Sequence, residues 1–128
     1  MYHRRFTDER EQTIYALVSR GSLECYIGRT IDAKRRQREH LRGRDAITGG
    51  WVSRLGEDAK PDFLTLETIE AGFEAGRRGM DVEWAWKYAT RLCGWTVIGM
   101  PDDLSRAWPS TVEAAWRRAH QWRSTMRA

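Results

Sequence analysis

Cysteine is scarce in this chain of 128 residues, in which Cys25 and Cys93 are the only two. Two cysteines make neither a disulfide framework nor a four-cysteine zinc site, so a disulfide-rich miniprotein and a zinc finger are excluded. Long apolar runs are also missing, because none approaches the roughly 18 residues that a membrane-spanning helix needs. Residues 1–5 are not followed by the apolar segment of a secretory signal. We therefore expect neither export nor insertion into a membrane.

Charge is abundant and unevenly placed. Charged residues make up 31% of the chain and hydrophobic residues 41%, which is typical of a globular domain, and the length favours a single one. The net charge is +4, but residues 29–44 carry a local balance of +5, residues 104–128 one of +4, and residues 61–103 one of −4. This pattern indicates a polyanion held by two basic patches with acidic groups near its centre, although solvated helix faces produce similar runs.

The apolar pattern predicts a mixed chain of strands and helices. Two strand-like runs, residues 13–18 and 23–29, flank a turn at residues 19–22, and a third strand is predicted over residues 62–69. Asp32 is a suitable N-cap for a helix that ends near Leu41. A short helix is expected to end near Gly56, and further helices over residues 82–93, capped by Asp81, and from Ser110 onward. The apolar stripe of the last helix consists of Val112, Ala115, Trp116, Ala119 and Trp122.

The first two strands are expected to form a hairpin in which partner residue numbers sum to 41. In this register Ile14, Ala16 and Val18 lie on one apolar face with their partners, and Tyr15 lies opposite Tyr26 on a more polar face. The two hydroxyls would then be presented together beside Gly28, whose missing side chain would leave room for a ligand. The simpler alternative is a cross-strand aromatic pair that only stabilises the sheet.

The order and spacing of five elements resemble the GIY-YIG nuclease family over residues 13–98. These elements are the triplet Thr13-Ile14-Tyr15, the triplet Tyr26-Ile27-Gly28 after ten intervening residues, Arg36 with His40, the third strand with Leu66-Glu67, and the helical segment Glu83-Trp84-Ala85-Trp86. Two positions depart from the family pattern. Thr13 replaces the leading glycine, and Thr96 stands where an asparagine is frequent.

The resemblance implies an α/β (α+β) fold: a three-stranded antiparallel sheet flanked by helices, with an extra C-terminal helix. It divides the chain into a tail at residues 1–11, a nuclease-like domain at 12–100 and a basic, tryptophan-containing helical extension at 101–128. The extension either packs on the core or grips DNA. Its apolar stripe favours packing and would leave Arg117, Arg118 and Arg123 pointing outward. Trp51, Trp86 and Trp116 are expected in the core, whereas Trp95, Trp108 or Trp122 could stack on bases.

The resemblance also implies a divalent-metal-dependent endonuclease that hydrolyses DNA phosphodiester bonds, with Tyr15, Tyr26, Arg36, His40 and Glu83 as catalytic residues. Arg36 and His40 project from one helix face because they are four residues apart. Arg36 suits a phosphate, and Glu83 suits Mg²⁺, for which Mn²⁺ can substitute. The water-activating base is a tyrosine or His40, and the choice between Tyr15 and Tyr26 stays open.

The expected partner is double-stranded or branched DNA, bound by a monomer or a homodimer of a cytoplasmic protein of bacterial or phage origin. The basic residues expected to contact DNA are Arg29, Lys34, Arg35, Arg38, Arg42 and Arg44. The principal alternative is a nucleic-acid-binding module that keeps the fold but cleaves weakly or not at all. For Glu83 the alternative to a metal ligand is an ion pair with Lys87, four residues further along the same helix. A third possibility is an adaptor in which the two tyrosines only pack.

Overall fold

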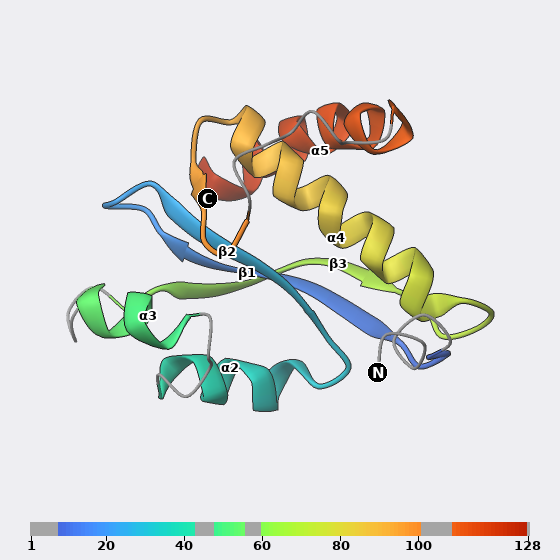
Figure 1. The fold of residues 1–128 in the computed structure, drawn as a ribbon, viewed down its shortest axis with the longest axis horizontal. Coiled ribbons are helices and arrows are strands. Elements are labelled where there is room, and N and C mark those ends of the chain that lie inside the picture. The colour runs from blue at the N-terminus through green and yellow to red at the C-terminus, as the bar shows by residue number, and fades with distance from the viewer. Residues whose placement is uncertain (1–7, 43–47, 56–59, 101–108, 128) are drawn as a thin grey trace.

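A computed structural model describes residues 8–42, 48–55, 60–100 and 109–127, which form a mixed α/β fold (Figure 1). The described elements, in chain order, are β1 (Gln12–Ser19), β2 (Glu24–Thr30), α2 (Ala33–Leu41), α3 (Gly49–Leu55), β3 (Asp62–Ile69), α4 (Ala75–Leu92), β4 (Thr96–Val97) and α5 (Pro109–Arg127). The strands form one sheet in the order β3-β1-β2-β4. Helices α4 and α5 cover one face of the sheet, and α2 and α3 lie on the other (Figure 1). Within these described ranges, none of the helices is both long and apolar enough to span a bilayer.

The prediction of a three-stranded antiparallel sheet is correct for β3, β1 and β2 but misses the fourth strand. Both β2 and β3 run antiparallel to β1, as expected. Strand β4 pairs in parallel with β2, so the sheet is mixed rather than purely antiparallel. Strand β4 has only two residues, and a segment that short carries no alternation from which a strand could be recognised.

The hairpin register differs from the predicted one by two residues. Tyr15 lies opposite Gly28, and Leu17 lies opposite Tyr26, so partner numbers sum to 43. The turn occupies residues 20–23, where the Leu23 amide bonds to the Arg20 carbonyl at 3.4 Å and Leu23 adopts a positive φ of 54°. Leucine rarely adopts this conformation, so the sequence does not predict a turn at this position. Because the shift is even, each side chain stays on its predicted face.

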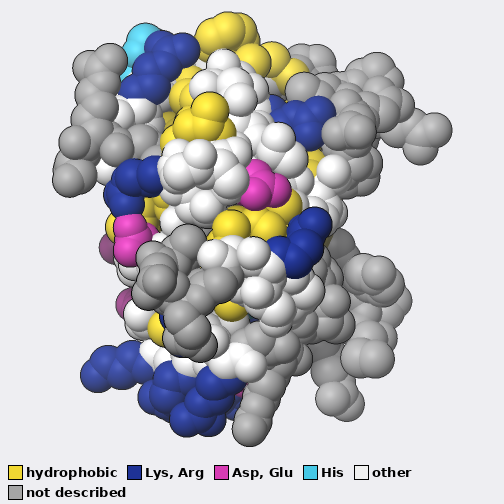
Figure 2. Space-filling model, turned by 90° about the vertical axis from the view of Figure 1, so that its left-hand side faces the viewer, with side chains coloured by type: hydrophobic (Ala, Val, Ile, Leu, Met, Phe, Trp, Pro, Cys, Tyr) yellow, Lys and Arg dark blue, Asp and Glu magenta, His cyan; other side chains and the backbone are white. Residues whose placement is uncertain are grey.

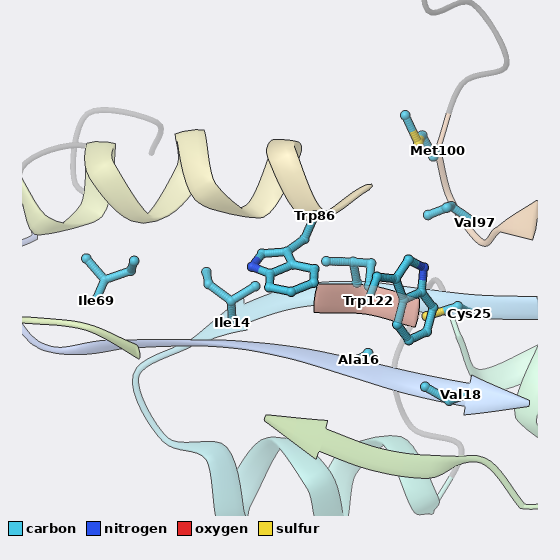
Figure 3. Packing of buried hydrophobic residues seen from close by; sticks show 10 residues of the cluster. Ile14, Ala16, Val18, Cys25, Ile69, Trp86, Val97, Met100 and Trp122 are labelled. Carbon is cyan, nitrogen blue, oxygen red and sulfur yellow. The ribbon is translucent and has the colours of Figure 1, made fainter. Parts of the chain in front are cut away.

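The larger core lies between the sheet and the α4–α5 pair. Ile14, Ala16 and Val18 of β1 face Trp86 of α4 and Trp122 of α5 (Figure 3). Trp122 is 1% exposed, which excludes the suggested base-stacking role for it. Trp95 packs against it, with ring centroids 5.5 Å apart, and Trp108 lies outside the described residues.

Helix α4 begins seven residues before the predicted start, at Ala75 rather than after Asp81. Glycines 76 and 79 lie in the added turns, and each costs about 1 kcal/mol in a helix interior relative to alanine. The sequence therefore disfavours a helix there. Tertiary packing outweighs that preference, because Ala75, Gly76 and Gly79 are buried. The predicted end is confirmed, since Cys93 is the C-cap and Gly94 follows with a φ of 87°.

Two further predictions about exposure are wrong. The sheet face that carries the tyrosines is not open, because Tyr15 and Leu17 are fully buried in a second core beside Trp51 and Val52 of α3. On α5, the residues buried against α4 are Ala115 and Ala119, together with Trp122 in the main core, whereas Val112 and Trp116 of the predicted stripe are exposed. Trp116 is 54% exposed and is therefore not a core anchor.

Candidate functional site

Strands β1 and β2 and helix α2 bring both tyrosines, Arg36 and His40 into one cluster. The Tyr15 hydroxyl lies 2.7 Å from His40 Nε2 and accepts a hydrogen bond from Arg36 Nε at 3.3 Å. The ring centroids of Tyr15 and Tyr26 are 6.1 Å apart, and those of Tyr26 and His40 are 5.3 Å apart. The tyrosines are thus diagonal neighbours rather than direct partners. Four of the five predicted catalytic residues therefore meet in space.

Thr48 is a member of this cluster that sequence reasoning missed. Its Oγ1 lies 2.7 Å from His40 Nδ1, on the opposite side of the imidazole from Tyr15. His40 and Thr48 are both fully buried. A buried imidazole bound at both nitrogens is fixed in its orientation, since rotation would break two hydrogen bonds in a low-dielectric environment. No motif marks Thr48, because its contact with His40 is a tertiary one between residues eight positions apart that share no element.

Gly28 has a different role from the predicted one. A Cβ atom at this position would lie 2.5 Å from the Tyr15 hydroxyl oxygen and 2.6 Å from Cζ of the same ring. The space that the missing side chain leaves is therefore filled by the ring of Tyr15, its cross-strand partner, and not by solvent or ligand. The glycine lets the tyrosine ring lie flat over β2, where its hydroxyl reaches His40.

The two tyrosines have unequal environments. Burial raises the pKa of Tyr15 well above its ordinary value, and the neighbouring Tyr26 raises it further, while Arg36 opposes both effects. Tyr15 therefore stays protonated at neutral pH. Tyr26 is only partly buried.

An open pocket of about 430 Å³ lies beside this cluster. It is lined by Asp8, Gln12, Tyr26, Arg29, Thr30, Ile31, Arg35, Arg36, Glu39 and Glu83. Tyr15 and His40 do not line it, so they lie behind Tyr26 and Arg36 as seen from the pocket. Arg36 Nη1 also donates to Glu39 at 2.7 Å, a bond that lowers the pKa of that carboxyl. The pocket thus joins residues from β2, α2 and α4 that are far apart in the sequence.

Glu83 reaches the pocket from α4 with a half-buried carboxylate that contacts two cations. Lys87 Nζ lies 2.9 Å from its Oε2, and Arg29 Nε lies 3.6 Å from its Oε1. The ion pair with Lys87 is the alternative that the spacing predicted. Glu83 makes this ion pair and also lines the pocket. In the part of the chain that the structure describes, no group of three or more His, Cys, Asp or Glu side chains could hold a metal ion.

The basic residues predicted to contact DNA fall into two groups. Arg29 and Arg35 line the pocket, and Arg29 also donates to the Gly76 carbonyl of α4. Lys34, Arg38 and Arg42 are exposed on or just after α2, the lowest element in Figure 1, and basic side chains gather at that level in Figure 2. Arg44 lies outside the described residues.

A second, larger pocket of about 950 Å³ lies between β3, α4 and α5, away from the tyrosines. At its floor Glu67 accepts hydrogen bonds from Trp86 Nε1 at 3.0 Å and from Arg118 at 3.1 and 3.2 Å. Arg118, predicted to point outward, is therefore anchored to β3. The charges at the floor compensate each other, and none of the five predicted catalytic residues lies there.

No protein-family model, no curated protein and no solved structure matches this chain.

Proposed function

We propose that this chain is a divalent-metal-dependent endonuclease that hydrolyses DNA phosphodiester bonds by a GIY-YIG-type mechanism. The observation that carries the proposal is the convergence of Tyr26, Arg36 and Glu83 on one open pocket. These residues come from three different elements, and each supplies a group that phosphodiester hydrolysis needs: a hydroxyl for water, a guanidinium for the phosphate and a carboxylate for a cation.

Arg36 is the phosphate-binding group in this proposal. A guanidinium can donate two parallel hydrogen bonds to the non-bridging oxygens of a phosphate, which fixes its orientation as well as its position. The hydrogen bonds of Arg36 to Tyr15 and Glu39 hold the side chain in place before substrate arrives. Such preorganisation stabilises charge that develops in the transition state without a reorganisation cost.

Tyr26 is the water-activating group, because it lines the pocket whereas Tyr15 is buried behind it. The water gives its proton to the Tyr26 oxygen as its own oxygen bonds to phosphorus and the P–O bond to the leaving group breaks. Tyr26 must first lose its hydroxyl proton. The imidazole of His40, whose ring centroid lies 5.3 Å from that of Tyr26, is the nearby base that would take up that proton.

Glu83 is the residue that would hold Mg²⁺. A single carboxylate with waters and a substrate phosphate is a common Mg²⁺ environment, so the donor chemistry fits, provided that the ion competes with Lys87 for Glu83. When bound, the ion would stabilise negative charge on the phosphate and the leaving oxygen. Arg29, which contacts the other carboxylate oxygen of Glu83, keeps that side chain directed toward the pocket.

The rival proposal is a binding module that does not cleave. The pairing of Glu83 with two cations favours it, because a carboxylate that is already neutralised has less affinity for a metal. The two proposals differ in what Mg²⁺ does. An endonuclease requires the ion for turnover, whereas a binding module binds DNA equally well without it.

The test is cleavage of supercoiled plasmid, linear duplex, branched and single-stranded DNA with Mg²⁺, with Mn²⁺ or with EDTA. We expect nicking in Mg²⁺ that is lost in Glu83→Gln and Arg36→Ala and reduced in Tyr26→Phe. The matched controls are Glu113→Gln and Arg54→Ala, which change exposed residues outside the pocket and should leave cleavage unchanged. DNA binding without cleavage under either metal supports the binding module instead.

A further inference from the structure

The loop between β3 and α4 presents an aromatic side chain to solvent. Phe73 is 80% exposed, more than any other large hydrophobic side chain for which the structure gives an exposure. Burying a phenylalanine side chain contributes roughly 1.5–3 kcal/mol to the stability of a fold. Phe73 makes almost none of that contribution, because its side chain stays in water. Single exposed apolar side chains are common on protein surfaces, so the exposure of Phe73 is informative only together with its held backbone and its place beside the pocket.

The loop is held in place by a network of hydrogen bonds to its backbone. Arg78 donates to the carbonyls of Phe73 and Glu70, at 3.2 and 3.1 Å. The Gly72 amide bonds to the Glu9 carbonyl at 2.8 Å. These contacts on both sides of Phe73 hold its backbone fixed while its side chain points away from the protein.

Two residues that flank Phe73 have positive φ angles, 139° at Gly72 and 54° at Glu74. Glycine accepts such angles, but a left-handed glutamate costs about 1–2 kcal/mol. The unfavourable backbone conformation of Glu74 therefore directly follows the exposed ring of Phe73 in the chain. Costs of this kind persist where the surrounding structure enforces them, and they cluster at functional sites.

This loop adjoins the pocket of the proposed active site. The Gly76 amide donates to the Asp8 carbonyl at 2.7 Å, and Asp8 lines the pocket. The Gly76 carbonyl accepts from Arg29, the residue that contacts Glu83. Phe73 is three residues before this junction, and the loop between β3 and α4 lies at the end of the molecule opposite the tip of the β1–β2 hairpin (Figure 1).

We propose that Phe73 stacks on an unpaired nucleobase next to the phosphodiester bound in the pocket. This inference rests on the proposed function, since it needs a nucleic acid in that pocket. A ligand that suits both features combines an anionic group, which the guanidinium groups of Arg29, Arg35 and Arg36 can bind beside the carboxylates that also line the pocket, with a flat apolar surface for the ring. A nucleotide strand has both, because every base has a π-face that an aromatic side chain can cover. Phe73 thereby selects substrates with an unstacked base beside the bond that is cut.

The experiment measures binding of the full chain to a forked DNA that carries 2-aminopurine at the fork, in EDTA so that no cleavage occurs. Removal of an aromatic stacking partner weakens binding by about 5- to 150-fold. We expect a loss of this size for Phe73→Ala, recovery in Phe73→Trp, and a 2-aminopurine fluorescence change that Phe73→Ala abolishes. Leu23→Ala is the matched control, since Leu23 is 53% exposed at the distant hairpin tip.

Salt dependence separates stacking from charge. Stacking releases no counterions, so Phe73→Ala should lower affinity without changing the slope of log Kd against log salt, whereas Arg35→Ala should reduce that slope by about 1. If the wild type binds and Arg35→Ala weakens it while Phe73→Ala does not, the stacking proposal is overturned and the proposed function stands. If the wild type binds no DNA of any form, both are overturned.

Discussion

Gly28→Ala is the substitution that most directly probes how the site is built. The new methyl group would lie 2.5 Å from the Tyr15 hydroxyl oxygen and 2.6 Å from Cζ, distances that Cβ atoms essentially never show to non-bonded neighbours. The ring of Tyr15 must therefore move, and it is fully buried between β2 and Phe63, on which it stacks with centroids 4.8 Å apart. Overpacking of this kind costs about 1–3 kcal/mol. Displacement also breaks the hydrogen bond to His40, which adds about 0.5–1.5 kcal/mol.

We therefore expect Gly28→Ala to lower the free energy of unfolding by about 1.5–4.5 kcal/mol, summed from those two costs, as measured by urea denaturation. Gly50→Ala is the matched control: a Cβ there meets no atom within 4 Å, and alanine is favoured in a helix, so stability should stay level or rise. A double-mutant cycle assigns the cost, because Gly28→Ala should be nearly neutral in a Tyr15→Leu background. An unchanged cost in that background, or a loss below about 0.5 kcal/mol in the wild type, would refute the packing argument.

Three further predictions concern the buried groups. Thr48→Val should cost about 1–3 kcal/mol of stability by leaving His40 Nδ1 without its partner, and should change the ¹⁵N shifts of the His40 ring, whereas Thr48→Ser should restore both; identical His40 spectra in all three proteins would contradict the contact. The raised pKa of Tyr15 means that the unfolded chain ionises first, so stability is fully present below pH 10 and declines above it, by at most about 1.4 kcal/mol per pH unit. Tyr15→Phe should remove that part of the decline in alkaline urea titrations, and parallel curves for the two proteins would argue against it. Burial also raises the pKa of the Cys25 thiol, so a Cys93→Ala variant should react with a thiol reagent only after denaturant is added, and fast labelling of the native protein would show that Cys25 is accessible.

The parts of the fold that sequence patterns predicted well are those in which local signals and packing agree. Strand β3 and helix α2 have the predicted bounds, because Pro61 precedes the former and Asp32 caps the latter by accepting from the Arg35 amide at 3.1 Å. The predicted start of α4 is wrong because the low helix propensity of its glycines opposes the burial that stabilises the helix there. The predicted register of the hairpin is wrong because Leu23, in its turn, adopts a left-handed backbone conformation.

The sequence predicted which residues come together in the candidate site, but not which of them line the pocket and which are buried behind it. The spacing of Arg36 and His40 placed both on one helix face, and the structure brings both to Tyr15. No sequence pattern could show that Tyr15 and His40 lie behind Tyr26, since this depends on α3 covering the sheet. Thr48 and Phe73 could not be predicted either, because both depend on tertiary structure. Thr48 is identified by its contact with His40, and Phe73 is identified by its exposure.

The central claim is tested most directly by plasmid nicking with the wild-type chain and the Glu83→Gln variant, each titrated with Mg²⁺ and each also assayed for DNA binding. We predict that the wild type nicks only with the metal, and that Glu83→Gln binds DNA as tightly as the wild type does but does not cut it. Equal nicking by both proteins, or binding by the wild type with no nicking at any Mg²⁺ or Mn²⁺ concentration, would contradict it.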